Sequence, residues 1–405
     1  MTHGDGVDAD TPTVVHVATV DVSLEKLLGP QLEAIAAAGY RVIGASAPGP
    51  YVEALSRRGI EHVPLAHATR AMAPLEDVRA VAELVALLRR IRPSIVHTHT
   101  PKPSIYGRMA ARLAGVPVIV NTVHGLYAQP EDPWPKRFAV YGAERLAATC
   151  SQAELVASPE DLDTLSRLRV PADRLVLLNA GLGIDLDRFD PDTVTAADRA
   201  AARRELGADA DDDVVVGVVA RLVREKGYPE LFDATARLRG RHPRLRVAAI
   251  GPDEPDKADA LTEADRRTAR DIGIRFLGAR DDVARLYAGM DILVLASHRE
   301  GFPLTPMEAA AMGVPVVATD IRGCRQVVDD GTTGLLVPVG DPVALAAAIE
   351  RLAMDPAERR RLGTAARRKA QDSFDQGRCI DITLATYERL LVRAGLAVPG
   401  KTAAA

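Results

Sequence analysis

The sequence predicts an α/β protein with two doubly wound parallel-sheet domains. Three observations lead to this fold class: a length of 405 residues, an alternation of short apolar strands with helices, and a break in that alternation between residues 177 and 213. A chain of this length exceeds one ordinary hydrophobic core, so two domains are expected. Strands that are separated by single helices pair in parallel, and helices then cover both faces of the sheet.

The first half of the chain alternates regularly. Strands rich in β-branched residues are expected at 13–20, 41–47, 94–100 and 117–125. Helices with apolar residues every three or four positions connect them. These helices are expected at 23–40, 77–93 and 104–116. Gly39 and Pro93 are the stop signals of the first two helices.

The alternation restarts at residue 214. Strands are expected at 214–221, 245–251, 274–278, 291–297 and 314–319. Helices are expected at 228–243, 257–272, 282–290 and 341–353. An amphipathic helix after residue 375 is expected to pack back across the boundary between the two domains.

The expected organisation therefore has five parts. These are a disordered leader (1–12), an N-terminal domain (13–188), a C-terminal domain (189–374), the returning helix (375–397) and a disordered tail (398–405). The leader lacks a basic region followed by an apolar one, so it is not expected to be a signal peptide. No run of about 18 apolar residues predicts a membrane span. The three scattered cysteines favour a reducing, cytoplasmic compartment.

The net charge of −4 and the pI near 6.2 argue against general binding to polyanions. No nucleic-acid partner is therefore expected, and any basic function has to be local. Arg221 and Lys226, with four residues between them, directly follow an expected strand. Ligands of doubly wound sheets bind beyond the carboxyl ends of the strands, and such cations suit a phosphate or diphosphate. An ordinary solvated basic loop explains the same residues equally well.

Two carboxylates flank a turn in the second half. Glu300 and Glu308 have seven residues between them, and Glu308 falls on what the pattern makes the first turn of a helix. Gly301 permits a close ligand approach, and backbone N–H groups at the helix start suit an anion. Both glutamates can accept hydrogen bonds from paired hydroxyls. The alternative is that Glu300 is an ordinary surface acid and that Glu308 only balances the helix dipole.

Three histidines also lie on or just after expected strands. His124 is placed to reach a ligand, although a core histidine bonded to a carbonyl is an equally plain explanation. His97 and His99 point the same way, but no third ligand is close in the sequence, so no metal site is expected. The loop at Arg280 either lines a base pocket or is a helix start capped by Asp282.

Together these motifs resemble the retaining glycosyltransferases of the GT-B fold, family 4. The matching segments are E-x7-E (Glu300 and Glu308), R-x4-K (Arg221 and Lys226), NTVHG around His124, GLGIDLDRF, FLGARDDV, and residues 313–342. The block from 97 to 127 is most similar to bacterial members that extend lipid-linked or polysaccharide glycans. The resemblance runs over nearly the whole chain and implies two Rossmann-like domains facing a central cleft.

The resemblance implies a nucleotide-diphosphate sugar donor, most often a UDP-sugar, with no metal or other cofactor. Arg221 and Lys226 would neutralise the diphosphate, Glu308 would hold the ribose hydroxyls, and Glu300 would contact the donor sugar. His124 would lie near the 6-hydroxyl of that sugar, and Arg280 and Val283 would flank the base. The remaining donor contacts would come from Gly301, Phe302, Pro303, Leu304 and Thr305.

The resemblance implies that the acceptor attacks from the leaving-group face, with a phosphate oxygen taking its proton. One departure concerns the first loop, where Val22, Ser23 and Leu24 stand in place of the family's glycine pair. Two rival functions share the architecture: a non-hydrolysing sugar-nucleotide epimerase and a non-catalytic sugar-nucleotide-binding protein. The combination of E-x7-E with R-x4-K favours transfer.

The expected acceptor is a glycan, a polyprenyl-linked saccharide or a small molecule. Aromatic and basic residues at 134–141 can rest on the inner face of the cell membrane, which would make the protein a peripheral membrane partner. Lys102, Arg108 and Arg112 are expected to add to that face. A plain amphipathic helix is the alternative.

Overall fold

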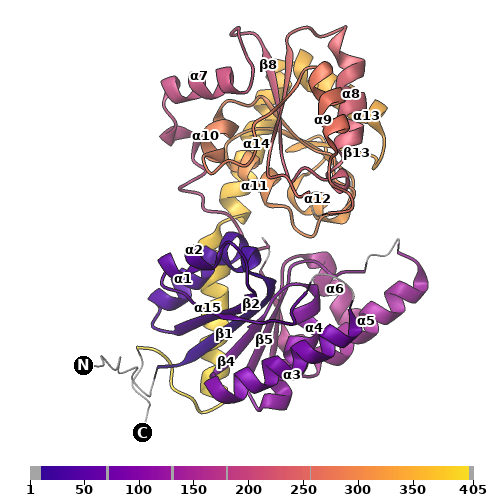
Figure 1. The fold of residues 1–405 in the computed structure, drawn as a ribbon. Helices are drawn as coiled ribbons and strands as arrows, with labels where there is room; N and C mark the ends of the chain where they lie inside the picture. The colour runs from indigo at the N-terminus through magenta and orange to yellow at the C-terminus, as the bar shows by residue number, and fades with distance from the viewer. Residues whose placement is uncertain (1–10, 70–72, 129–131, 179–180, 256, 401–405) are drawn as a thin grey trace. The chain divides into compact units, whose positions relative to one another are not determined.

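A computed structural model of the chain describes residues 11–69, 73–128, 132–178, 181–255 and 257–400. The chain forms two compact units, one made of residues 1–182 and 377–405 and the other of residues 183–376 (Figure 1). Each unit has one parallel sheet with helices packed on it, so the predicted α/β class with two Rossmann-like domains is confirmed. The leader at 1–10 and the tail at 401–405 lie outside the described residues.

The first unit has a seven-stranded sheet with the order β3-β2-β1-β4-β5-β6-β7. Its strands are β1 (Thr13–Val20), β2 (Arg41–Ala47), β3 (Glu61–Pro64), β4 (Ile95–Thr98), β5 (Val118–Val123), β6 (Ala153–Val156) and β7 (Leu175–Leu177). Its helices are α1 (Gly29–Ala37), α2 (Val52–Arg57), α3 (Pro74–Ile91), α4 (Pro101–Ala114), α5 (Trp134–Ala148), α6 (Pro159–Arg167) and α15 (Gln376–Arg393). The sequence patterns missed β3, β6 and β7, because these strands have only three or four residues and little apolar periodicity.

The two faces of this sheet are covered differently. Val15, Val96 and Ile119 belong to a buried apolar cluster with leucines of α3 and alanines of α4. On the opposite face lies α15, whose Tyr387 bonds to His97 of β4. Figure 1 shows this last helix of the chain lying beside β1 and β4, which come from its beginning. The C-terminal helix is therefore part of the first unit.

The second unit has a six-stranded sheet with the order β10-β9-β8-β11-β12-β13. Its strands are β8 (Val214–Val219), β9 (Leu245–Ile250), β10 (Ile274–Phe276), β11 (Ile292–Leu295), β12 (Val316–Thr319) and β13 (Gly334–Val337). Its helices are α7 (Ala196–Glu205), α8 (Tyr228–Arg239), α9 (Glu263–Asp271), α10 (Val283–Ala288), α11 (Leu304–Ala311), α12 (Arg322–Val327), α13 (Pro342–Met354) and α14 (Pro356–Ser373). Its core joins valines of β8 to leucines of α8 and α13.

The boundaries between the units lie at 182/183 and 376/377, whereas the sequence patterns put them at 188/189 and 374/375. The two crossings are linked to each other. The N–H of Ile184 donates to Phe374 O at 2.8 Å, and Gln376 N–H donates back to Ile184 O at 3.0 Å. At Gly183 a Cβ would lie 2.5 Å from the Cα of Gln376, so only glycine fits this contact. Long-range backbone pairing of this kind leaves no local pattern in the sequence.

Candidate active site

The loop after β8 comes close to the end of β11. Gly227 has a φ of +75°, and a Cβ there would lie 2.0 Å from the carbonyl oxygen of Ala296. Glycine is therefore required both for the left-handed conformation and for the close approach. The approach brings Lys226, on the short turn that precedes α8, next to Glu300, which follows β11.

Lys226 and Glu300 form an ion pair. The distance from Lys226 Nζ to Glu300 Oε1 is 2.7 Å, and the same oxygen accepts a hydrogen bond from Ser297 Oγ at 2.7 Å. The Lys226 side chain is 13% exposed and the Glu300 side chain 14%, so both charges are largely removed from water. A partly desolvated ammonium group interacts more strongly with an anion than one in bulk solvent does.

Arg221 occupies the same loop but has a different partner. Its Nη1 lies 2.6 Å from Oε2 of Glu254, which follows β9. Its side chain is 34% exposed, so the guanidinium group remains accessible to an anion. The sequence patterns did not single out Glu254, because an acidic residue in a polar loop carries no signal of its own.

Glu308 lies in the second turn of α11, one turn later than the sequence pattern indicated, because the helix begins at Leu304 after the N-cap Pro303. Its Oε2 accepts a hydrogen bond from the Tyr287 hydroxyl at 2.8 Å. Burial raises the pKa of the Glu308 carboxyl above its ordinary value, and the bond from Tyr287 opposes that rise. Tyr287 of α10 thus holds this carboxylate, a contact that no local spacing predicts.

The residues between the two glutamates form the expected turn. Gly301 and Phe302 are half-buried, Pro303 is buried, and Leu304 and Thr305 open α11. The turn packs on α12, because a Cβ at Gly323 would lie 2.7 Å from the carbonyl oxygen of Glu300. Backbone N–H groups of the first helical turn are therefore held in a fixed direction.

Arg280 belongs to an ion-pair cluster. It bonds to both carboxylate oxygens of Asp282 at 2.8 Å and also to Glu205, and Arg285 shares these two acids. Asp282 does stand at the N-cap of α10, but its side chain makes no capping bond, so the predicted cap is wrong. The two arginines outcompete the backbone N–H groups for its carboxylate. Val283 is the first residue of α10 and is half-buried.

His124 belongs to the first unit and follows β5. Its Nε2 lies 3.2 Å from Nδ1 of His99. The expectation that His97 and His99 lack a third neighbour is wrong, because His16 of β1 offers a ring nitrogen within 4.8 Å of theirs. The strand register aligns His16 with His97, across 81 residues of sequence. Three buried imidazoles, a side chain that metal ions commonly use as a ligand, therefore lie close together.

The first loop does not form a glycine cradle. Residues Ser23–Leu27 form a π-helix, and the carboxylate of Asp21 accepts the N–H groups of Val22 and Tyr51 at 2.8 and 2.7 Å. Asp21 is 4% exposed, and its carboxylate bonds to these backbone N–H groups.

The start of α5 has the exposed aromatic face that the sequence predicts. The side chains of Trp134 and Phe138 are 75% and 77% exposed. They line an open groove of about 450 Å³ together with Arg137, Tyr141 and Arg145. Within the described part of the chain, none of the helices combines the length and the apolar character needed to span a bilayer.

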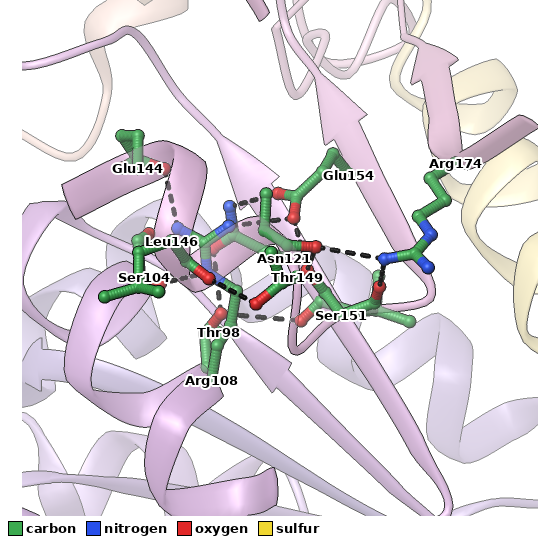
Figure 2. A network of polar contacts seen from close by, with 12 residues as sticks. Thr98, Ser104, Arg108, Asn121, Glu144, Leu146, Thr149, Ser151, Glu154 and Arg174 are labelled. Atoms are coloured by element: carbon green, nitrogen blue, oxygen red, sulfur yellow. Dashed lines mark hydrogen bonds and ion pairs between the residues drawn. The ribbon is translucent and has the colours of Figure 1, made fainter. Parts of the chain in front are cut away.

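Arg108 was expected on that face, and this expectation is wrong. Its side chain is fully buried, where Nη1 bonds to Glu154 at 2.8 Å and Nη2 to Glu144 at 2.6 Å. Figure 2 shows this network joining α4, α5 and β6 and continuing through Asn121 to Thr98. The helical periodicity of α4 places Arg108 inward, and the two glutamates compensate its charge there.

Comparisons with known proteins agree with this architecture. Residues 198–369 match the family model "Glycosyl transferases group 1", and residues 24–181 match "Glycosyl transferase 4-like domain". The D-inositol 3-phosphate glycosyltransferase of Geodermatophilus obscurus is 34% identical over 327 residues, 76% of this chain and 69% of that protein. The Escherichia coli UDP-Gal:alpha-D-GlcNAc-diphosphoundecaprenol alpha-1,3-galactosyltransferase is 26% identical over 288 residues, 69% of this chain and 72% of that protein.

A solved structure shows the same fold. Anabaena Alr3699/HepE, crystallised in complex with UDP, superimposes with a TM-score of 0.75 at 21% sequence identity. The match covers 94% of this chain and 100% of the Anabaena chain.

Proposed function

The chain belongs to the GT-B glycosyltransferases of family 4, and from this premise we propose that it is a retaining transferase that uses a UDP-sugar. The acceptor is a hydroxyl of a glycan, a lipid-linked saccharide or a small molecule. The observation that carries the proposal is the pairing of Lys226 with Glu300 at the strand ends, because it puts a desolvated cation and a hydroxyl acceptor side by side. The UDP of the Anabaena complex and the UDP-Gal named for the Escherichia coli relative support the choice of base.

On this proposal the diphosphate binds Lys226 and Arg221. The bond from the anomeric carbon to the phosphate oxygen breaks, and negative charge builds on that oxygen. Fixed positive groups stabilise this charge in the transition state, so no metal is needed. The acceptor hydroxyl attacks from the face that UDP leaves, a new carbon–oxygen bond forms there, and the hydroxyl proton passes to the departing phosphate. The configuration at the anomeric carbon is thereby retained.

The carboxylates orient the donor. Glu308, held by Tyr287, accepts hydrogen bonds from the ribose hydroxyls, and Glu300 accepts them from the sugar. Gly301, Phe302, Pro303, Leu304 and Thr305 provide backbone contacts at the turn. Arg280 and Val283 flank the base, and His124 contacts the donor sugar.

The proposed contact with the membrane, and with a lipid-linked acceptor, is based on α5. Exposed aromatic side chains beside Arg137 and Arg145 suit an anionic bilayer surface. The diphosphoundecaprenol acceptor named for the Escherichia coli relative supports a lipid-linked saccharide. We expect the protein to float with vesicles that contain anionic lipid, and Trp134→Ser with Phe138→Ser to abolish this. Equal flotation with neutral vesicles would contradict the membrane contact.

The function is tested in two steps, a screen for donor binding and an analysis of the product. Thermal unfolding is measured with UDP-, GDP-, ADP- and TDP-sugars, and the UDP-sugars should give the largest increase in Tm, because a bound ligand stabilises the folded state by mass action. The selected donor is then incubated with a glycan acceptor, and NMR determines the anomeric configuration of the product. Retention is expected. An inverted product, or an epimerised donor without transfer, would contradict the proposal.

A further inference from the structure

A continuous chain of hydrogen bonds runs through the first unit and ends at His124. His97 Nε2 lies 2.7 Å from Thr122 Oγ1, and His97 Nδ1 lies 2.5 Å from the Tyr387 hydroxyl. That hydroxyl lies 3.5 Å from His16 Nε2. The chain then continues through the remaining rings, from His16 Nδ1 to His99 Nε2 at 3.0 Å and from His99 Nδ1 to His124 Nε2 at 3.2 Å.

Each ring in the chain is neutral. His16, His97 and His99 are fully buried, and burial lowers the pKa of His16 to about 3 and that of His124 to about 4. A neutral imidazole has one N–H donor and one bare acceptor nitrogen. The direction of one hydrogen bond therefore determines the direction of the next, and two proton arrangements let the Tyr387 O–H donate to one of its two histidine neighbours.

The distances at Tyr387 distinguish these two arrangements. A phenol has a single proton, and burial raises its pKa well above the ordinary value, so the proton is retained. The O–H donates to the nearer nitrogen, Nδ1 of His97 at 2.5 Å, because a phenol donating to an imidazole forms the stronger and shorter bond. The phenol oxygen then accepts from His16 Nε2–H, and the same sense continues to the end of the chain.

In this arrangement all four histidines carry the proton on Nε2. His97 Nε2–H donates to Thr122, His99 Nε2–H donates to His16, and His124 Nε2–H donates to His99. We propose that His16, His99 and Tyr387 are positioning residues that hold His124 as the Nε2-protonated tautomer and leave its Nδ1 as a hydrogen-bond acceptor. This deepens the proposed function and rests on it in one respect, that His124 contacts the substrate. A substrate hydroxyl or N–H then has to donate to His124 Nδ1.

A metal ion is the competing occupant of the same cluster. Three-histidine metal sites direct one nitrogen of each ring to a common point. Here His16, His97 and His99 each use both ring nitrogens in hydrogen bonds. A metal would have to replace several of these bonds, so the observed distances favour the hydrogen-bonded chain.

The test is the protonation state of individual ring nitrogens. The full-length protein is labelled with ¹⁵N-histidine, and the His124 signals are assigned with His124→Gln. Long-range ¹H–¹⁵N spectra at neutral pH should show a protonated Nε2 and a bare Nδ1 for His124. A protonated Nδ1 in the unmodified protein would overturn the proposal, and so would 1:1 binding of added Zn²⁺ that removes the signals of His16, His97 and His99 together.

Tyr387→Phe removes the proton that selects one arrangement, so a mixture of His124 tautomers is expected. Tyr40→Phe is the matched control. The Tyr40 ring lies 5.8 Å from that of Tyr387, but the Tyr40 hydroxyl takes no part in the hydrogen bonds between the histidines. Thr122→Val is a second variant with the same expected shift, since it leaves His97 Nε2–H without its acceptor. Unchanged His124 signals in folded Tyr387→Phe or Thr122→Val would overturn the proposal.

Activity provides a separate readout. With the donor sugar, Tyr387→Phe should lower kcat/KM by about two- to tenfold, because part of the protein then holds the other His124 tautomer and loses one hydrogen bond to the substrate, whereas Tyr40→Phe should not. If the unmodified protein transfers no sugar, the proposed function fails. The tautomer of His124 then still tests whether the hydrogen bonds from Tyr387, His16 and His99 fix its protonation.

Discussion

The strand ends of the second unit and the polar network between α4, α5 and β6 of the first contain the same types of charged residue, but the network is buried more completely. Lys226 and Glu300 follow strands, retain some exposure to solvent and face each other as a single pair. Arg108 of α4, Glu144 of α5 and Glu154 of β6 are fully or nearly fully buried and connect to further hydrogen-bond partners. The cation of the Lys226–Glu300 pair is thus accessible to a ligand, whereas the cation of the Arg108 network contributes to packing. Activity and stability should respond separately to changes in the two regions.

The largest effect is expected from Arg108→Met. This change leaves two glutamates buried without their cation, which typically costs about 3–5 kcal/mol of unfolding free energy. Equilibrium unfolding in denaturant measures it. The triple variant with Glu144→Gln and Glu154→Gln should recover much of the loss, because no uncompensated charge remains. A loss below about 1 kcal/mol for Arg108→Met alone would contradict the buried-network interpretation.

Lys226→Ala tests the other side of the comparison. Loss of one charge stabiliser should raise the barrier by about 2–4 kcal/mol, or lower kcat/KM roughly 30- to 1,000-fold. The free energy of unfolding should fall less than in Arg108→Met, because Glu300 keeps some exposure to solvent and a hydrogen bond from Ser297. The matched control is Arg224→Ala in the same turn, whose guanidinium group pairs with Asp265 and is 48% exposed. Equal losses of activity in both variants would show that the turn, and not the Lys226 charge, is responsible.

Acid should destabilise the first unit through its buried histidines. Burial lowers the pKa of His16 to about 3 and that of His124 to about 4, from 6.5. Below pH 6.5 only the unfolded chain takes up these protons, so the stabilisation is complete above that pH and decreases as the pH falls toward 4. Each such histidine contributes a slope of about 1.4 kcal/mol per pH unit.

Unfolding midpoints between pH 7 and pH 4.5 measure this slope. His16→Asn should reduce it. The control is His298→Asn, since His298 lies in the second unit and its side chain is 44% exposed. A slope that is the same in all three proteins would rule out His16 as a source of the acid sensitivity.

The smallest effect is expected from Tyr287→Phe. Loss of its hydrogen bond should weaken UDP binding by about 0.5–1.5 kcal/mol, as calorimetry can measure. The bond lowers the pKa of Glu308 against the effect of burial, so its removal should raise that pKa further. The loss of affinity should then be greater in mildly acidic solution. Equal UDP affinity in both proteins at every pH would show that Tyr287 does not act through Glu308.

Local spacing accounts for the parts that were predicted well. The turn between Glu300 and α11 depends on a glycine, a proline and a short apolar helix within a dozen residues. The contact between Lys226 and Glu300 was not predicted, although both residues lie just after strands and the carboxyl ends of parallel strands share one edge of a sheet. The sequence pattern put Glu308 on the first turn of its helix, whereas the structure puts it on the second. The exact start of a helix is difficult to predict because helix ends are the least regular part of the pattern.

The sequence by itself determined the α/β class, the two sheets and the residues that follow each strand, because strand and helix periods are local properties of the chain. Only the tertiary structure decided that Arg108 is internal, that His16 and Tyr387 join His97, and that α15 belongs to the first unit. These contacts span tens to hundreds of residues. They arise from strand register and from the burial of polar groups that must find partners, and no short stretch of sequence encodes either one.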